Sequence, residues 1–460
     1  MDHARPERTV LRRARTADSS LLFSSPIFAL TALVFAAGGA QARTHRPAHG
    51  TGPRVTSQLS GSVVAREGGR LRLATQLGNV IVHTGDTAKI DYSVELEADA
   101  GPDAKELLKE FRILTREVPD GVVIKGLTTD EEECTGRLWV TIRVNMPRDY
   151  NVEVSTGGGN IETDDVSGRV NLFTAGGNIS AGNIDGPARI ESASGGHISL
   201  KNVAGDLTAI TGGGHITTGS VGGNATLRTT GGHIRVGSVQ GIARLDTGGG
   251  NITLQQSGSD LIAETAGGQI EVGEAAGLVR ARTGGGGIRV VRLSGPTNLE
   301  TAGGSIYLTQ VDSSVRASAV AGGITAWFVA PPKGQSPCEF NSNDGDIVVY
   351  LPRQIPVTID ARIQMGDDHR LIVDPAFPLK VSYDASARGE RMVRAEGALN
   401  GGGEVIRLRT VAGNIRVALS DTNKQLQIQK EQMEQITRQI QAQMRLLLPI
   451  EPSGSPTPQP

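Results

Sequence analysis

An internal repeat between about Asn160 and Ile324 constrains the fold of this chain more than any other feature. Each unit carries Gly-Gly, one variable residue and Ile, and the last unit lacks the variable residue. Successive isoleucines are 18 residues apart, except for one interval of 19 residues. The ten isoleucines are Ile161, Ile179, Ile198, Ile216, Ile234, Ile252, Ile270, Ile288, Ile306 and Ile324. A fixed period of about 20 residues is typical of a solenoid, in which each unit buries its apolar edge against its neighbours.

Within each unit, two short alternating runs are separated by glycines. One run begins at the Ile, a Gly such as Gly223 or Gly241 usually follows seven positions later, and a second run, such as residues 225–229, leads to the next Gly-Gly. Period-two alternation indicates strands, glycine suits the tight turns, and stacked coils place parallel strands about 4.8 Å apart with right-handed winding. The prediction is an all-β fold: a right-handed parallel β-solenoid of 18-residue coils, with a short N-terminal helical insertion and a C-terminal α-helix.

Charge and composition exclude several classes of partner. The formal net charge is −2, so no strong field favours nucleic acid or acidic membranes. Aromatic residues make up 3% of the chain, which argues against stacking platforms for bases or sugars. We therefore expect no nucleic-acid partner.

The first 42 residues have the pattern of a secretory signal. Arg12, Arg13 and Arg15 precede an apolar run from Leu21 to Ala37, and Ala40-Gln41-Ala42 follows as a cleavage site. An uncleaved anchor helix is the alternative, because the run is nearly long enough to span a membrane. Under either interpretation the chain is exported, to the periplasm, the cell surface or the extracellular space.

The rest of the chain divides by composition and periodicity. Strand patterns flank the repeats on both sides, and Leu107, Leu108 and Phe111 have helical spacing in the first flank. The predicted segments are a signal peptide at 1–42, a linker at 43–56, an N-terminal β segment at 57–155 with a helix at 102–114, regular repeats at 156–330, a C-terminal β segment at 331–420, a Gln-rich amphipathic helix at 421–448 and a disordered tail at 449–460.

The Gln-rich helix has two interpretations. Four apolar residues lie seven apart, at Leu426, Met433, Ile440 and Leu447, and Ile436 occupies an intervening position. Heptad spacing is typical of a coiled coil, which predicts self-association through helix 421–448. Alternatively, the helix covers an end of the solenoid, because an open terminal coil is an unpaired edge.

Three stretches resemble an exported bacterial putative-adhesin domain family of unknown function. They are Val144-Asn145-Met146-Pro147 before the repeats, the Gly-Gly-Asn-Ile motif at 176–179 and 249–252, and Asp344-Gly345-Asp346-Ile347 leading to Leu351-Pro352. The resemblance covers residues 57 to 420. It implies the Gly-Gly-Asn-Ile repeat β-solenoid fold and brings no catalytic residues.

Equivalent positions of successive coils form columns in a solenoid, so sites are sought along columns. The column five residues before each Ile is mostly threonine, as at Thr211, Thr229 and Thr247. Threonine columns occur in ice-binding solenoids, but this position shares its parity with apolar Leu227 and Leu245. We therefore expect inward hydroxyls that bond the turn backbone.

The column one residue before each Ile contains three consecutive histidines, His197, His215 and His233, between asparagines. Three histidines on neighbouring coils lie within reach of one transition metal. The other interpretation is that this corner needs a polar side chain that caps its neighbours. This second interpretation agrees with our expectation that the protein has no cofactor.

The outward column six residues before each Ile is charged across five coils. Its members are Arg228, Asp246, Glu264, Arg282 and Glu300. Enzymes on β-helices carry acidic and cationic groups on such a face, and adjacent carboxylates about 5 Å apart would suit a retaining glycosidase. A surface charge ladder is the simpler interpretation, and short coils leave no long loops to form a cleft.

The sequence therefore predicts a non-enzymatic exported β-solenoid, acting as an adhesin-like binding surface or envelope scaffold. Its ligand would be an unknown envelope protein or glycan. The alternative is a polysaccharide-active enzyme, a lyase or glycosidase, using Asp246, Glu264 and Arg282.

Two further expectations follow from the repeat. Gly213 and Gly232 should be required for positive φ or for close approach of neighbouring coils. Cys134 precedes the first coil and Cys338 follows the last, so about 43 Å of stacked strands should separate them, too far for a disulfide.

Overall fold

The computed structural model describes residues 53–129, 138–334, 336–365, 368–385 and 391–445. The predicted signal peptide, most of the predicted linker, the tail and Cys134 lie outside these ranges. The linker prediction was wrong at its end, because residues 54–56 already belong to the first strand, β1 (Arg54–Val64).

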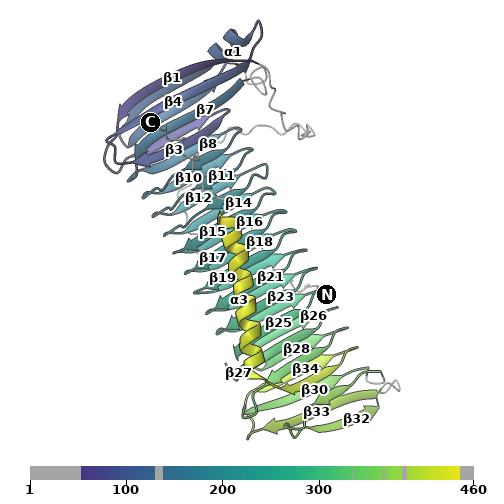
Figure 1. The fold of residues 1–460 in the computed structure, drawn as a ribbon. Coiled ribbons are helices and arrows are strands. Elements are labelled where there is room, and N and C mark those ends of the chain that lie inside the picture. Colours follow the sequence, from purple (N-terminus) through teal and green to yellow (C-terminus); the bar gives the residue numbers. More distant parts are fainter. Residues whose placement is uncertain (1–52, 130–137, 335, 366–367, 386–390, 446–460) are drawn as a thin grey trace, which may run out of the picture. The chain divides into compact units, whose positions relative to one another are not determined.

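The regular repeats form two parallel sheets, the arrangement of a solenoid, which Figure 1 shows as a stack of coils. In sheet A the strands are β9 (Ile161–Thr163), β11 (Ile179–Ala181), β13 (Ile198–Leu200), β15 (Ile216–Val221), β17 (Ile234–Val239), β19 (Ile252–Ser257), β21 (Ile270–Ala275), β23 (Ile288–Leu293), β25 (Ile306–Ser313) and β27 (Ile324–Lys333). In sheet B they are β8 (Asn151–Thr156), β10 (Val170–Thr174), β12 (Ala188–Ser192), β14 (Leu207–Thr211), β16 (Ala225–Thr229), β18 (Ala243–Thr247), β20 (Leu261–Thr265), β22 (Val279–Thr283), β24 (Thr297–Thr301), β26 (Val315–Ala319) and β28 (Cys338–Ser342).

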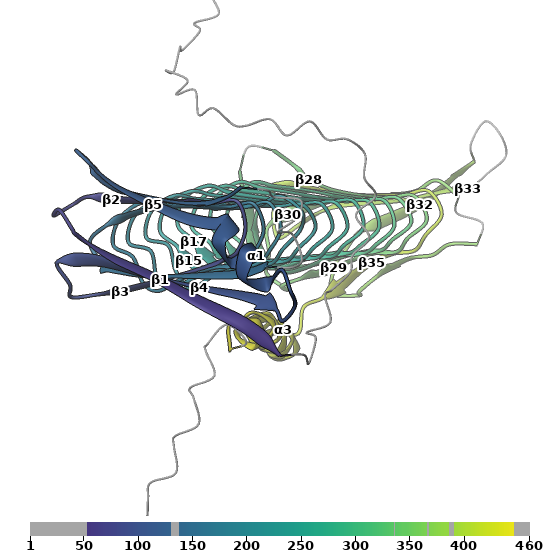
Figure 2. The same cartoon turned by 90° about the horizontal axis from the view of Figure 1, so that it is seen from above.

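The repeat isoleucines form a continuous column in the core. Ile216 pairs in register with Ile234, Ile234 with Ile252, and so on along sheet A. Each repeat isoleucine is almost completely buried, because period-two alternation turns it towards sheet B. Figure 2 shows the two sheets as facing layers. The buried apolar side chains of the two sheets form one core cluster.

The N-terminal end of the stack is built from longer strands. Sheet A continues through β3 (Asn79–Gly85), β7 (Leu138–Pro147), β4 (Lys89–Asp99) and β1, and the last two pairings in that series are antiparallel. Sheet B continues through β2 (Arg70–Thr75), β6 (Gly121–Thr128) and β5 (Phe111–Val118). The predicted helix at 102–114 is shorter than expected: α1 spans Ala104–Glu110, and Phe111 to Leu114 belong to β5, where β6 supplies an antiparallel partner.

The C-terminal end continues both sheets. β29 (Ile347–Leu351), β35 (Ile415–Leu419) and β31 (Leu371–Val373) extend sheet A. β34 (Val405–Thr410), β30 (Val357–Ile363), β33 (Arg391–Leu399) and β32 (Lys380–Ala385) extend sheet B, and the last two pairings are antiparallel.

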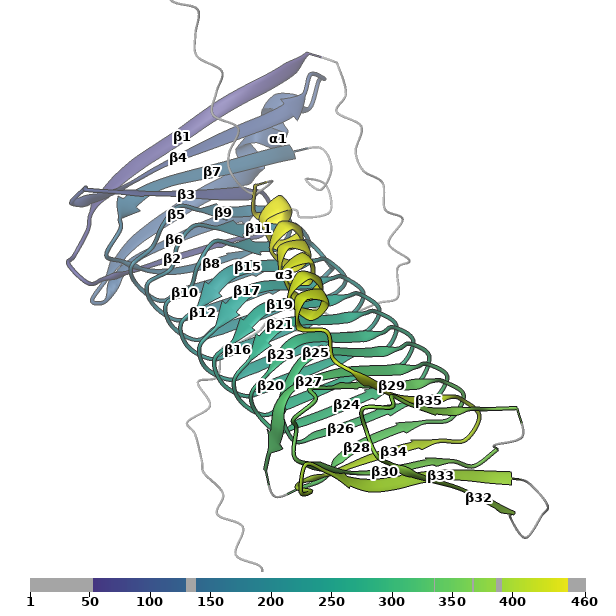
Figure 3. The ribbon, with the colours of Figure 1, turned by 60° about the horizontal axis from the view of Figure 1, so that its bottom comes forward.

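The Gln-rich helix, α3 (Thr422–Arg445), lies on the outer face of sheet A. It contacts six successive strands, β15, β17, β19, β21, β23 and β25, and Figures 1 and 3 show it running along the stack. The expectation that it covers an end of the solenoid was wrong. Its apolar residues Ile436 and Ile440 pack on Val291 of β23. The helix therefore covers the outer face of sheet A and not an open end of the solenoid.

The corners explain the glycine content. A Cβ on Gly232 would collide with the backbone carbonyl of Gly214 in the neighbouring coil, so close coil approach requires glycine there. The expectation for Gly213 was wrong, because a Cβ there meets nothing within 4 Å. The one 19-residue interval places its extra residue at a corner, where Gly195 has a φ of 108°.

Cys338 is buried at the start of β28, where its thiol lies 3.8 Å from the Ser313 carbonyl oxygen. Burial raises the pKa of this thiol to about 11, so it is unreactive at neutral pH. Cys338 is free, as expected. The thiol state of Cys134, which lies outside the described residues, stays a prediction.

Candidate ligand-binding face

The charged column identified in the sequence lies on the outer face of sheet B. Its five members, Arg228, Asp246, Glu264, Arg282 and Glu300, are register partners on β16, β18, β20, β22 and β24. Buried residues flank each of them on its own strand, so alternation directs all five side chains away from the core.

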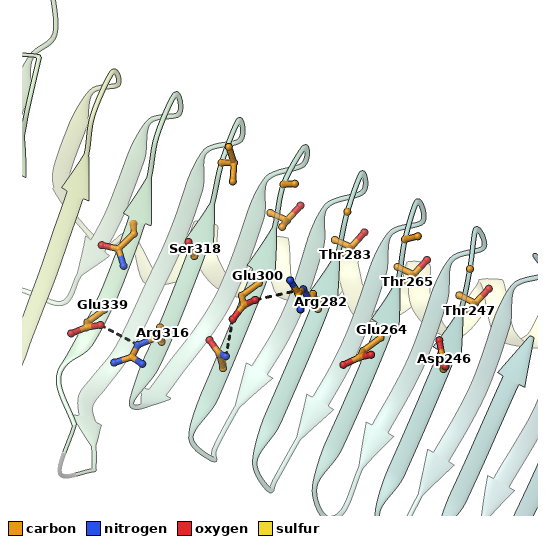
Figure 4. A pocket seen from close by; sticks show the side chains of 18 residues that line it. Asp246, Thr247, Glu264, Thr265, Arg282, Thr283, Glu300, Arg316, Ser318 and Glu339 are labelled. Carbon is orange, nitrogen blue, oxygen red and sulfur yellow. Dashed lines mark hydrogen bonds and ion pairs between the residues drawn. The ribbon is translucent and has the colours of Figure 1, made fainter. Parts of the chain in front are cut away.

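A groove of about 780 Å³ follows this column across successive coils (Figure 4). Four of the charged residues and the Arg316 and Glu339 side chains line one part of it. A shelf of small corner residues lines the other part: Gly248, Ala266, Gly284 and Ala302. Small side chains beside long ones leave a shallow trough whose direction is that of the stack.

Two of the three carboxylates in the column are paired with arginine. Arg228 Nε lies 3.1 Å from Asp246 Oδ2, and Arg282 Nε lies 3.7 Å from Glu300 Oε2. Glu264 makes no hydrogen bond or ion pair with any residue in the described ranges. It therefore offers a free acceptor to a ligand in the groove.

Asp246 and Glu264 are the two carboxylates that a glycosidase mechanism on this face would use. They are direct partners on adjacent parallel strands, as an acid–base pair would need. However, the groove is an open trough, and Asp246 is already engaged by Arg228. The geometry brings the two carboxylates together without the enclosure that usually accompanies general acid catalysis.

The rings of the histidine column stack on one another in the turns that directly precede β13, β15 and β17 of sheet A. Ring centroids are 4.8 Å apart for His197 and His215, and 4.9 Å apart for His215 and His233. Each Nδ1 accepts a hydrogen bond from the backbone N–H of the next coil, at 2.8–2.9 Å. Asn178 and Asn251 use their Oδ1 atoms in the same way. The geometry thus gives histidine and asparagine one shared capping role.

This role requires neutral rings with an unprotonated Nδ1. Burial lowers the pKa of His215, and the neighbouring His197, His233 and Arg235 lower it further. Burial and Arg235 likewise lower the pKa of His233. No group of three His, Cys, Asp or Glu in the described part of the chain is arranged to hold a metal ion.

The threonine column points inward, as expected. In successive coils a buried threonine donates to the carbonyl of a glycine 15 residues earlier, as Thr229 Oγ1 does to Gly214 at 2.8 Å. The same hydroxyl accepts from Gly232 N in its own corner at 3.3 Å. In the 19-residue coil, Ser192 takes this position in place of Ala193.

Sequence reasoning missed a second outward column on the same face. Eight residues before the Ile, Arg244, Arg280 and Arg316 lie on β18, β22 and β26, with Ile262 and Asn298 on the strands between them. The signal was present, because tabulating that position shows arginine in alternate units from Arg244 to Arg316.

Comparisons with known proteins identify no family. No family model and no curated protein matches the sequence. A putative cell adhesion protein from Clostridium sporogenes matches structurally at 7% identity and a TM-score of 0.18, covering 79% of this chain and 100% of that one. A putative adhesin from Parabacteroides distasonis matches at 11% identity and a TM-score of 0.21, covering 66% of this chain and 94% of that one.

Both TM-scores are too low for these likenesses to carry an argument about this chain. The resemblance to the putative-adhesin domain family therefore stays a prediction. In the described ranges, none of the helices combines the length and the apolar character needed to cross a membrane.

Proposed function

We propose that this chain is a non-enzymatic, exported, right-handed β-solenoid that acts as an adhesin-like binding surface or scaffold at the cell envelope. Its ligand is an envelope glycan or protein that lies along the outer face of sheet B. Export rests on the signal pattern in residues 1–42, and the handedness rests on the general preference of parallel crossovers.

The observation that carries the proposal is the groove on sheet B. It runs across the coils from Asp246 to Asn341, and no described helix or loop covers it. A trough that repeats at the strand spacing suits a polymer better than a compact small molecule. Glu264 has no partner within the chain and is available for contact.

A polysaccharide-active enzyme remains the second candidate, because Asp246 and Glu264 are adjacent on the same face. Self-association through α3 also stays a prediction. The outward side of α3 exposes Leu426, whereas its inward side is occupied by sheet A.

The proposal is tested by sedimenting the purified full chain with envelope fragments of the organism that makes it. We expect co-sedimentation that Glu264→Gln combined with Arg282→Gln greatly reduces. The matched control is Glu274→Gln with Arg292→Gln, an ion pair of 3.9 Å on the outer face of sheet A in nearly the same coils. Equal binding by both double variants would contradict a ligand site on sheet B.

Two additions sharpen the experiment. Fragments treated with periodate or with protease distinguish a glycan ligand from a protein ligand. Analysis of the soluble phase for new reducing ends or unsaturated sugars tests the enzyme alternative, because the proposed binding surface releases neither.

A further inference from the structure

The outward column that contains Arg244 carries arginine on every second strand of sheet B. Along successive register partners from β18 to β34, the column reads Arg244, Ile262, Arg280, Asn298, Arg316, Glu339 and Arg407. The four arginines are thus two strand spacings apart, or about 9.6 Å. We call these four residues the arginine row.

At one end of the arginine row, an anion of the chain itself already sits between two guanidinium groups. Glu339 Oε2 lies 3.0 Å from Arg316 Nε, and Glu339 Oε1 lies 3.1 Å from Arg407 Nη1. One carboxylate therefore bridges two arginines that are two strands apart. This is the spacing and chemistry that the rest of the row repeats.

At the other end, the same bridging position is not filled by an acid. Between Arg244 and Arg280 the intervening residue is Ile262, which has no charge to offer. Both arginines are exposed, and neither forms an ion pair or side-chain hydrogen bond with any described residue. Two unpaired guanidinium groups flank a position where Glu339 shows that a carboxylate fits.

Glu264 lies on the same strand as Ile262, two residues further along, and it faces outward beside the small-residue shelf. Its free carboxylate repels a second negative group but accepts hydrogen bonds from hydroxyls. A ligand that suits both features carries a carboxylate for the two arginines and hydroxyl donors for Glu264. Uronic acids have this combination.

We propose that the groove on sheet B, together with the adjoining arginine row, binds an extended polysaccharide containing uronic acid. Arg316 of the row lines the groove, and Arg244 and Arg280 lie beside it. One uronate carboxylate lies over Ile262 and is bridged by Arg244 and Arg280, as Glu339 is bridged by Arg316 and Arg407. Ring hydroxyls of the sugar donate to Glu264. This inference rests on the proposed function, because it names the ligand of the same face.

The test measures binding of three probes to the full chain by isothermal titration calorimetry. The probes are polygalacturonate, the same polymer with its carboxyl groups reduced to alcohols, and polyphosphate. We expect polygalacturonate to bind, the reduced polymer to bind at least about tenfold more weakly, and polyphosphate to bind weakly because it has no ring hydroxyls.

Variants then assign the contacts. Arg244→Gln with Arg280→Gln should weaken polygalacturonate binding about tenfold or more, and Arg244→Lys with Arg280→Lys should restore part of it, because lysine keeps the charge but not the guanidinium fork. Glu264→Gln should weaken binding less. The control is Arg189→Gln, an earlier outward arginine of sheet B that already pairs with Glu191 at 3.4 Å. All variants should have the same melting temperature as the wild type.

The outcomes separate this inference from the proposed function. Equal binding of the carboxyl-reduced polymer, or polyphosphate binding as tight as that of polygalacturonate, would overturn uronate recognition. Unchanged binding in the Arg244/Arg280 double glutamine variant would overturn the bridging site. If none of the probes binds while envelope fragments still require Glu264 and Arg282, the uronate proposal fails and the binding face stands.

Discussion

The outer faces of sheets A and B are built from the same coils, yet only one of them is covered. On sheet A, α3 lies over β15 to β25 (Figures 2 and 3). On sheet B, residues of β18 to β28 line an open groove. The difference begins with residue size. Three residues after the repeat isoleucine, three coils have glycine on sheet A: Gly219, Gly237 and Gly273. Outward positions of sheet B carry arginine and glutamate instead.

The glycines on sheet A allow close approach of neighbouring coils, and two of them also lie beside methionines of α3. A Cβ on Gly273 would collide with Gln255 O of the neighbouring strand and would lie 3.1 Å from Met433 Sδ of α3. One on Gly219 would lie 2.5 Å from Lys201 O, with Met444 Cε of α3 in ordinary contact at 3.4 Å. Polar contacts also hold α3 on the sheet, since Thr309 Oγ1 donates a hydrogen bond of 2.7 Å to Gln432 Oε1. Few apolar side chains take part, so shape and hydrogen bonds position α3 as much as hydrophobic burial does.

This comparison shows how a uniform repeat acquires two different surfaces. The inward residues are nearly the same in every coil, because each coil must pack on the next. The outward residues are free to vary, and they are small where the chain covers itself and charged where it does not. A charged face left open is the face on which a ligand is expected.

The largest expected effect concerns the covered face. Ile436→Ala combined with Ile440→Ala should detach α3, because removing a buried isoleucine side chain to Cβ costs about 2–5 kcal/mol at a well-packed site and these two are 1% and 5% exposed. The expected readout is rapid cleavage within 422–445 by limited proteolysis, with the solenoid left intact.

The matched control is Leu426→Ala, a helix position that is 53% exposed. It should leave the cleavage rate close to that of the wild type. If detachment of α3 also abolished ligand binding to sheet B, the two faces would not be independent. That result would contradict the assignment of separate roles to the two faces.

The second effect concerns the corners that both faces share. Gly232→Val should destabilise the chain by about 1–3 kcal/mol, because its side chain would overlap the backbone of the neighbouring coil. Gly213→Val should have little effect, since its Cβ meets open space. Denaturant unfolding of both variants checks the difference, and equal destabilisation would show that coil approach is not the cause.

A smaller effect is expected from the histidine column. Because the pKa values of His215 and His233 are lowered in the folded chain, the unfolded chain binds more protons as the pH falls below the ordinary histidine value of about 6.5. The free energy of unfolding should therefore decrease as the pH falls through this window. Protonation of Nδ1 also removes the acceptor that each coil offers to the next.

Replacing His197, His215 and His233 together by asparagine should flatten this pH dependence while keeping the caps, since Asn178 and Asn251 already cap in this way. Melting temperatures measured between neutral and mildly acidic pH compare the two proteins. An equally steep loss in the asparagine variant would place the pH dependence elsewhere.

Much of the fold was predictable because it is periodic. The 18-residue spacing of Ile216, Ile234 and Ile252 specifies which residues pair, and alternation specifies that Thr229 and its equivalents face inward. Deviations from the period were less predictable. The end of α1 at Glu110 depends on the pairing of β5 with β6, which local spacing of apolar residues does not report.

The candidate site was predicted in part for a similar reason. The column from Arg228 to Glu300 could be read directly, and the structure places it in register. The surface on which α3 packs could not be predicted. The sequence pattern of the helix indicates its apolar positions but not the residues of sheet A that they contact. The bridging role of Glu339 follows only from side-chain geometry.

The most direct test of the central claim, that the open face of sheet B is the ligand surface, is arginine footprinting by mass spectrometry. The full chain is modified with an arginine-specific dicarbonyl reagent, with and without polygalacturonate. We predict that the ligand protects Arg244 and Arg280 and leaves Arg292 and Arg416 on sheet A fully reactive. Protection of Arg292 or Arg416, with Arg244 and Arg280 unprotected in the bound state, would contradict the account.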